Sequence, residues 1–178
     1  MRKKNVLAAL IAGALLGSGS LMAAELSKAA ATFVNNEGAE VGTAELVSGP
    51  NGMVITLNLK GLPSGEKAVH IHAVGTCDDH GEGFKHSGGH LNPDHWKHGF
   101  LNPEGPDKGD LPNFFVHSDG TARAQMFTTL ASLDGSVGGQ VLDADGAALV
   151  IHEKGDDHQS QPIGGAGDRI ACGVIKAR

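Results

Sequence analysis

Five histidines stand at spacings that could gather their imidazoles around metal ions. His70 and His72 are two residues apart in a sequence typical of a strand, so both side chains would point to the same face. His90 follows two glycines that permit a close approach, His98 follows soon after, and His152 ends an apolar run in which a lone histidine would be out of place. Imidazole-rich sites suit copper and zinc. A histidine set without cysteine or methionine favours a copper ion that changes oxidation state.

Other readings of these residues remain open at this point. A single His-x-His pattern is a weak signal, and two histidines facing solvent on a polar sheet face would look the same. Hydrolytic chemistry has little support, because the chain contains neither Gly-x-Ser-x-Gly nor His-Glu-x-x-His. The composition of the cluster therefore favours redox chemistry over a zinc hydrolase.

The beginning of the chain has the layout of a secretory signal peptide. A basic start precedes an apolar run at residues 6–16, and cleavage is expected after Ala23 or Ala24. A membrane anchor is the alternative, but this run is shorter than the roughly 20 residues that a spanning helix needs. We predict that residues 1–24 are removed and that residues 25–178 form one domain in the periplasm, with no membrane span.

Charge and composition exclude one class of partner. Residues 1–24 contain three basic and no acidic residues, so their removal takes the formal net charge from −6 to −9. Such an acidic protein is a poor nucleic-acid binder, and no nucleic-acid partner is expected. The 27 glycines show no collagen period and are typical of a β protein with many turns and long loops.

Hydrophobic alternation predicts an all-β domain of about eight strands, arranged as an antiparallel β-sandwich or flattened barrel. The turn at 143–146 predicts a hairpin between 139–142 and 147–152. Two long polar loops interrupt the pattern, and such loops are expected only where they are functional. Strands are expected at 30–34, 41–47, 53–59, 67–73, 113–117, 121–127, 139–142, 147–152 and 170–175, and the loops at 74–112 and 153–168.

Two cysteines, Cys77 and Cys172, are the only ones in the sequence. In an exported protein a lone pair most simply forms a disulfide; two buried free thiols are the alternative. The bond would close a loop of roughly 95 residues and contribute on the order of 4–5 kcal/mol in the chain-entropy model.

Taken together, these segments resemble the copper–zinc superoxide dismutases, and more closely their secreted bacterial branch. The resemblance covers nearly all of the chain after the signal peptide and implies a Greek-key β fold. It is carried by HIH at 70–72, GGHLNP at 88–93, KHG at 97–99, GDLP at 109–112, VIHEK at 150–154, Asp156-Asp157 and GDRIACGVI at 167–175.

The resemblance also implies a role for each site residue. His90 would bridge two metals, and Arg169 would bind the substrate anion beside the copper. Asp156 would accept hydrogen bonds from one copper-ligand histidine, His72 or His70, and from the zinc-ligand histidine His98. The copper ligands would be His70, His72, His90 and His152, the zinc ligands His90, His98 and Asp110, and the disulfide Cys77–Cys172.

One position departs from the family pattern. The third zinc histidine of the family, three residues before the zinc aspartate, is Asp107 in this chain. A carboxylate is a competent zinc ligand, so Asp107 is a candidate for a two-histidine, two-aspartate zinc site. The alternatives are a weak or absent zinc site, or a substitute histidine from His80, His86 or His95.

By this resemblance the protein would dismutate superoxide to dioxygen and hydrogen peroxide with a redox-cycling copper. Superoxide is an anion, so the local positive charge of Arg169, aided by Lys85 or Lys154, must outweigh the negative net charge of the protein. A non-enzymatic periplasmic copper- or zinc-binding protein on the same scaffold is the alternative. Exposed Trp96 and Phe100 would anchor a homodimer, or would only cover their loop.

Overall fold

The computed structural model describes residues 26–178. The predicted signal peptide at residues 1–24 lies outside the described residues. Within them, no helix combines the length and the apolar character needed to cross a membrane.

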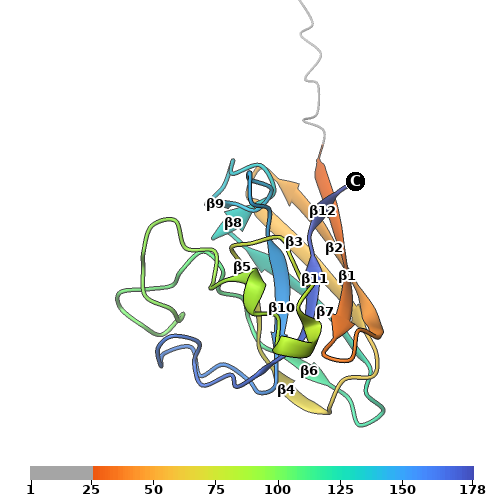
Figure 1. Cartoon of the computed structure of the whole chain (residues 1–178). Coiled ribbons are helices and arrows are strands. Elements are labelled where there is room, and N and C mark those ends of the chain that lie inside the picture. The colour runs from red at the N-terminus through yellow and green to blue at the C-terminus, as the bar shows by residue number, and fades with distance from the viewer. Residues whose placement is uncertain (1–25) are drawn as a thin grey trace, which may run out of the picture.

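A single antiparallel sheet of eight strands dominates the domain and curls into a half-barrel (Figure 1). Seven strands follow the order β5-β10-β11-β1-β2-β3-β7, and β12 pairs with β1. Because β11 lies beside β1, long connections cross the ends of the sheet, as in Greek-key folds. This confirms the predicted fold class. The strands are β1 (Ser27–Asn35), β2 (Glu40–Gly49), β3 (Gly52–Leu59), β4 (Gly65–Lys67), β5 (Val69–His72), β6 (Phe114–Val116), β7 (Ala122–Thr128), β8 (Ala131–Ser132), β9 (Gly139–Gln140), β10 (Ala148–His152), β11 (Arg169–Val174) and β12 (Lys176–Ala177).

The main core fills the concave side of the sheet. Along β3 every second residue is buried, from Met53 through Ile55 to Leu57, while Val54 and Thr56 between them are only partly buried. This period of two is what a strand with one face on a core requires. Phe33 on β1 packs into the same cluster.

Strands β5 and β10 are buried on both faces. One face supplies Ile71 and Leu149 to the main core. The opposite face of β10 carries Ala148 and Val150, which pack with Phe84 and Cys172 in a second, smaller cluster. The long loop that follows β5 is thus anchored by its own apolar contact to the back of the sheet.

Two strand predictions were wrong in detail. The strand expected at 67–73 is divided at Ala68 into β4, which pairs with β6, and β5, which pairs with β10. The division lies where the chain changes sheets: the Ala68 amide donates to the Lys154 carbonyl, and its carbonyl accepts from the His152 amide.

The hairpin expected across 139–152 does not form. Strand β9 contains only two residues and pairs in parallel with β8. Strand β10 has β5 on one edge and β11 on the other, so no edge is left for β9. The turn itself is present, with the Gly146 amide donating to the Asp143 carbonyl.

The two long loops lie together at one end of the sheet (Figure 1). The first contains only two single turns of 3₁₀ helix, η1 (His80–Glu82) and η2 (Lys85–Ser87). The second follows β10. Hydrogen bonds join them, from the Leu101 amide to the His158 carbonyl and from the His98 amide to the Gln161 side chain.

Candidate metal centre

Three histidines converge from two neighbouring strands. His70 and His72 project from the same side of β5, and His152 ends β10, which pairs with β5. All three are buried. One nitrogen from each ring lies within 4.8 Å of the others, so a single ion could contact all three.

Hydrogen bonds fix the orientation of each of these rings. His72 Nδ1 lies 2.9 Å from the Gly88 carbonyl, and His152 Nδ1 lies 3.1 Å from the Gly167 carbonyl. Because a carbonyl only accepts, Nδ1 carries the proton in both rings. In His70 the other ring nitrogen is the one that is hydrogen-bonded: its Nε2 lies 3.0 Å from a carboxylate oxygen of Asp156.

The remaining nitrogens have no hydrogen-bond partner in the described part of the chain. They are His70 Nδ1, His72 Nε2, His90 Nε2 and His152 Nε2, and all four are buried. Unpartnered buried nitrogens are costly. In His70, His72 and His152, whose pKa burial lowers, this nitrogen is the lone-pair nitrogen of a neutral imidazole, which is the form that binds copper. The residues present therefore fit this metal.

His90 comes from the long loop and stands between two clusters. An isolated β-bridge pairs it with His72, so that the loop briefly extends the edge of the sheet. Its ring centroid lies 4.1 Å from that of His70. While Nε2 is free, Nδ1 lies 2.9 Å from Asp107 Oδ2 and 3.5 Å from Asp110 Oδ1. The two nitrogens of one ring thus face different sets of ligands, as the bridging role requires.

The second cluster combines imidazoles with carboxylates. Ligand atoms of His90, His98, Asp107 and Asp110 all lie within 4.8 Å of one another, and Asp110 Oδ1 contacts His98 Nδ1. Two imidazoles and two carboxylates match the donor types of a four-coordinate zinc site. The residues present fit zinc as well.

The carboxylates of this cluster are held by backbone donors. Asp107 Oδ1 accepts from the Gly109 amide, which leaves Oδ2 directed at His90. Asp110 Oδ2 accepts from the amides of Gly99 and Asp107, which leaves Oδ1 directed at His98. The structure therefore brings Asp107 into the cluster. His80 and His95 lie in no such group among residues 26–178, and His86 belongs to a different one.

Asp156 joins the two clusters. Its Oδ2 accepts from His70 Nε2 at 3.0 Å and its Oδ1 from His98 Nε2 at 3.1 Å. Of the two copper-side candidates, the structure places His70 rather than His72 against this carboxylate. The backbone of Asp156 exchanges two hydrogen bonds with the side chain of Asn113.

The two clusters perturb their histidines in opposite directions. Burial lowers the pKa of His70 to about 3 and that of His152 to about 4, and it also lowers the pKa of His72. Burial acts on His98 in the same sense, but hydrogen bonds to Asp110 and Asp156 raise its pKa to about 10.

Arg169 is placed by an irregularity in the sheet. The register between β10 and β11 shifts after Ile151, so that Arg169 lies directly opposite His152. Its guanidinium donates to the carbonyls of Phe84 and Gly88 and contacts the Ser87 hydroxyl. Burial lowers the pKa of this half-buried group, which nevertheless remains a cation at neutral pH.

Two pockets, each of about 390 Å³, meet at Arg169. One reaches His152 and the other reaches His72 and His90. Of the two lysines expected to attract an anion, Lys85 lines the first pocket, whereas Lys154 is exposed and lies 3.9 Å from Glu153.

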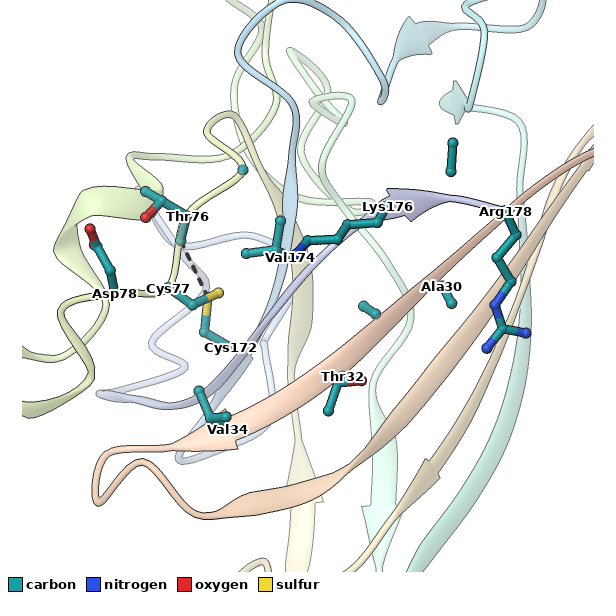
Figure 2. A pocket seen from close by; sticks show the side chains of 13 residues that line it. Ala30, Thr32, Val34, Thr76, Cys77, Asp78, Cys172, Val174, Lys176 and Arg178 are labelled. Carbon is teal, nitrogen blue, oxygen red and sulfur yellow. Dashed lines mark hydrogen bonds between the residues drawn. A yellow bond between two sulfur atoms is a disulfide. The ribbon is translucent and has the colours of Figure 1, made fainter.

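The disulfide joins the start of the first long loop to strand β11. Cys77 and Cys172 are joined with a Cα–Cα distance of 5.7 Å, which confirms the predicted pair. Figure 2 shows the bond at one end of a groove of about 580 Å³ that Thr32 and Val34 of β1 line.

Three contributors were not predicted from the sequence. The Ser87 hydroxyl lies 3.2 Å from both His72 Nδ1 and Arg169 Nη1. Gln161 accepts from the His98 amide and donates to its carbonyl. Asn113 follows the GDLP motif directly, but nothing in its type or spacing indicated a role.

Known proteins share both the sequence and the fold. The model of the family Copper/zinc superoxide dismutase (SODC) matches residues 40–175. The chain is 44% identical over 170 residues to superoxide dismutase [Cu-Zn] 2 of Aquifex aeolicus, covering 93% of this chain and 98% of the relative. It is 44% identical over 150 residues to superoxide dismutase [Cu-Zn] of Caulobacter vibrioides, covering 83% and 85%.

Among solved structures, a SOD-like protein from Bacillus subtilis superposes with a TM-score of 0.76 at 37% identity, covering 82% of this chain and 96% of that one. Sequence, fold and the two ligand clusters agree. The chain belongs to the copper/zinc superoxide dismutase family, whose members bind copper and zinc.

Proposed function

We propose that this protein dismutates superoxide to dioxygen and hydrogen peroxide. The observation that carries the proposal is the set of four buried imidazole nitrogens that have no partner among the described residues and lie beside a fixed guanidinium. A protein that only stores a metal needs the imidazole nitrogens, but it has no use for a guanidinium fixed beside them.

His70, His72, His90 and His152 would hold copper through these four nitrogens. Copper, when bound, supplies the one-electron exchange with superoxide. His90 would have a further role, because its Nε2, when it does not hold copper, can take up a proton from solvent while Nδ1 remains engaged by the carboxylate cluster. That nitrogen would deliver this proton to the reduced product, and the second proton of hydrogen peroxide would come from water.

His90, His98, Asp107 and Asp110 would hold zinc. Zinc lacks redox chemistry; its role here would be to keep the His90 ring in place from the other side. Asp107 in place of a histidine would add one negative charge to this site. Asp156 would orient one ligand of each metal through its two oxygens.

Arg169 would bind the substrate anion. The protein as a whole is acidic, so attraction must be local. The guanidinium lies where two pockets meet that lead to His152 and to His72. Lys85 lines the first of these and adds a second cationic side chain on the approach.

The alternative is a non-enzymatic copper- or zinc-binding protein on the same scaffold. The similarity to a protein described only as SOD-like keeps this alternative in view. The complete histidine set and the guanidinium beside it favour the enzyme.

A superoxide-consumption assay on the copper- and zinc-loaded protein tests the proposal. The enzyme should consume superoxide at rates far above those of the metal-free chain. The same chain loaded with zinc alone should be inactive, because zinc does not change oxidation state. Copper-loaded protein that is no faster than the metal-free control would establish the binding protein instead.

We further propose that the mature protein, residues 25–178, acts in the periplasm as a homodimer. Trp96 and Phe100 are 50% and 39% exposed and are large for solvent-facing side chains. Cell fractionation with N-terminal sequencing tests the location. Sedimentation of wild type against Trp96→Ser tests the dimer: a monomeric wild type, or a dimeric variant, contradicts it.

A further inference from the structure

A third group of metal-ligating side chains lies outside the centre described above. Asp78 and Asp79 directly follow Cys77 in the first long loop, His86 lies further along it in η2, and each offers one ligand atom within 4.8 Å of the others. His86 Nδ1 lies 3.0 Å from Asp78 Oδ1 and 4.0 Å from Asp79 Oδ1. None of the three belongs to either ligand set of the proposed copper and zinc sites.

Asp79 is the unusual member of this group. Its side chain is only 4% exposed, whereas those of Asp78 and His86 are 74% and 62% exposed. One of its oxygens accepts from the His86 amide, but the other, Oδ1, is buried and has no hydrogen-bond partner among residues 26–178. A buried carboxylate oxygen without a donor is costly. This oxygen faces His86, where a cation would satisfy it.

We propose that Asp78, Asp79 and His86 form a binding site for a third, divalent metal ion. One imidazole nitrogen and two carboxylate oxygens are donors that suit Zn²⁺. The exposure of Asp78 and His86 leaves the remaining coordination positions to water and gives the ion a direct path from solvent. The site is therefore open and exchangeable, unlike the buried copper and zinc sites.

The position of this site couples it to the substrate-binding guanidinium. Asp79 organises the turn that follows it, because its carbonyl accepts from the amides of Glu82 and Phe84. The same segment then presents the Phe84 and Gly88 carbonyls to Arg169. A cation bound between Asp79 and His86 would clamp residues 79–88 and so stiffen the support of the guanidinium.

The same side chains could also hold residues 79–88 in place without a metal. Asp78 and His86 form an ion pair whenever His86 is protonated, and Asp79 acts electrostatically on Arg169. These contacts alone would hold the segment without a metal. They leave Asp79 Oδ1 without a donor, which is why the cation is the better account.

Calorimetric titration of Zn²⁺ into the protein already loaded with copper and zinc tests the proposal. Wild type should bind one further equivalent. His86→Ala and Asp78→Asn should lose it; both residues are exposed, so neither change endangers folding. His117→Ala, which removes an exposed histidine outside the cluster, is the matched control and should retain it.

Hydrogen exchange of residues 79–88 with and without added Zn²⁺ tests the clamp. The amides of Phe84 and His86 should exchange more slowly when the third equivalent is bound, in wild type but not in His86→Ala. Absence of the further equivalent, its retention in His86→Ala, or binding without slower exchange would overturn the proposal. None of these measurements depends on dismutase activity.

Discussion

The two halves of the candidate metal centre meet at His90, but their buried histidines differ in how burial is compensated. On the copper side, three buried imidazoles are neutral, with the pKa of His70 lowered to about 3, and their free nitrogens face one another without donors among the described residues. On the zinc side, His98 carries charge against Asp110 and Asp156, and its pKa is raised to about 10.

The difference indicates which half depends more on its metal for stability. The zinc side satisfies its own polar atoms through ion pairs when no metal is bound, because carboxylates and protonated imidazoles are mutual partners. Among residues 26–178 the copper side has no such internal partner for its four free nitrogens. An ion would supply that partner, so copper is expected to contribute more to folding than zinc does.

Removal of a copper ligand should produce the largest effect. His152→Ala deletes one of the four free nitrogens at the end of β10. Activity should fall by more than roughly 100-fold, since even partners behind the ligands are typically worth 10–100-fold. Copper and zinc contents measured by mass spectrometry should show copper lost and zinc retained. Equal loss of both metals would break the distinction between the halves.

The pH dependence of the metal-stripped protein should show the two halves separately. Below about pH 6.5 the unfolded chain takes up protons on its histidines, whereas folded His152 and His70 remain neutral down to about pH 4 and 3. The unfolded state then binds more protons, so the free energy of unfolding falls as the pH drops from 6.5 to 4. For His152 the loss is up to about 3 kcal/mol.

The zinc side should give the opposite slope. Folded His98 keeps its proton up to about pH 10, whereas the unfolded chain releases it near 6.5, so stability falls as the pH rises from 6.5 towards 10. Urea unfolding across this range should therefore show a maximum near neutrality. His152→Gln should flatten only the acid limb and His98→Gln only the alkaline limb. A single variant that flattens both limbs would contradict the separation.

Asp156 is the point at which the halves communicate. In the wild type both oxygens of Asp156 accept hydrogen bonds from histidine N–H groups. Asp156→Asn replaces one of these oxygens by an –NH₂ group, which is itself a donor, so one of the two histidine contacts must fail. Metal affinity should fall roughly 10–100-fold at the affected site. Competition with a chelator, measured for each metal in turn, identifies that site. Unchanged affinity for both metals would remove Asp156 from the centre.

Arg169 lies opposite His152 and is proposed to serve the copper side. Arg169→Glu should lower activity by roughly tenfold or more and reverse its dependence on ionic strength, because attraction of the anion becomes repulsion. Arg123→Glu is the matched control. It makes the same charge change on β7, which is the last strand of the main sheet when the order is counted from β5. Stopped-flow rates between low and high salt check this. Equal salt dependence in both variants would refute steering by Arg169.

Asp107 should have the smallest effect and should act on zinc only. Asp107→Asn keeps an acceptor for the Gly109 amide but removes the charge that faces His90. Zinc affinity should fall roughly tenfold, with copper content unchanged. Asp107→His supplies a neutral ligand at the same position and should retain zinc. Unchanged zinc retention in Asp107→Asn after dialysis would exclude Asp107 as a ligand.

The sequence indicated which candidate site residues lie together better than it indicated the strands that carry them. His70 and His72 share a face because strand periodicity dictates it, and the resemblance supplied His90 and His98. The division at Ala68 and the failed hairpin before β10 were not predictable. Both depend on which strand occupies a neighbouring edge, which is a non-local property.

Supporting contacts were the hardest to predict. Ser87 and Gln161 act on ligands 15 and 63 residues away in sequence. Their residue types are common in loops, so only the folded loops reveal what they touch. Asp107 was recognised as a candidate because it occupies a defined position, but only the structure shows its oxygen directed at His90.

The position of the disulfide bears on how the Arg169 guanidinium is held in place. Cys172 lies on β11, the strand that also carries Arg169, and Cys77 begins the segment whose carbonyls hold that guanidinium. The covalent link therefore fastens the donor and its acceptors to each other.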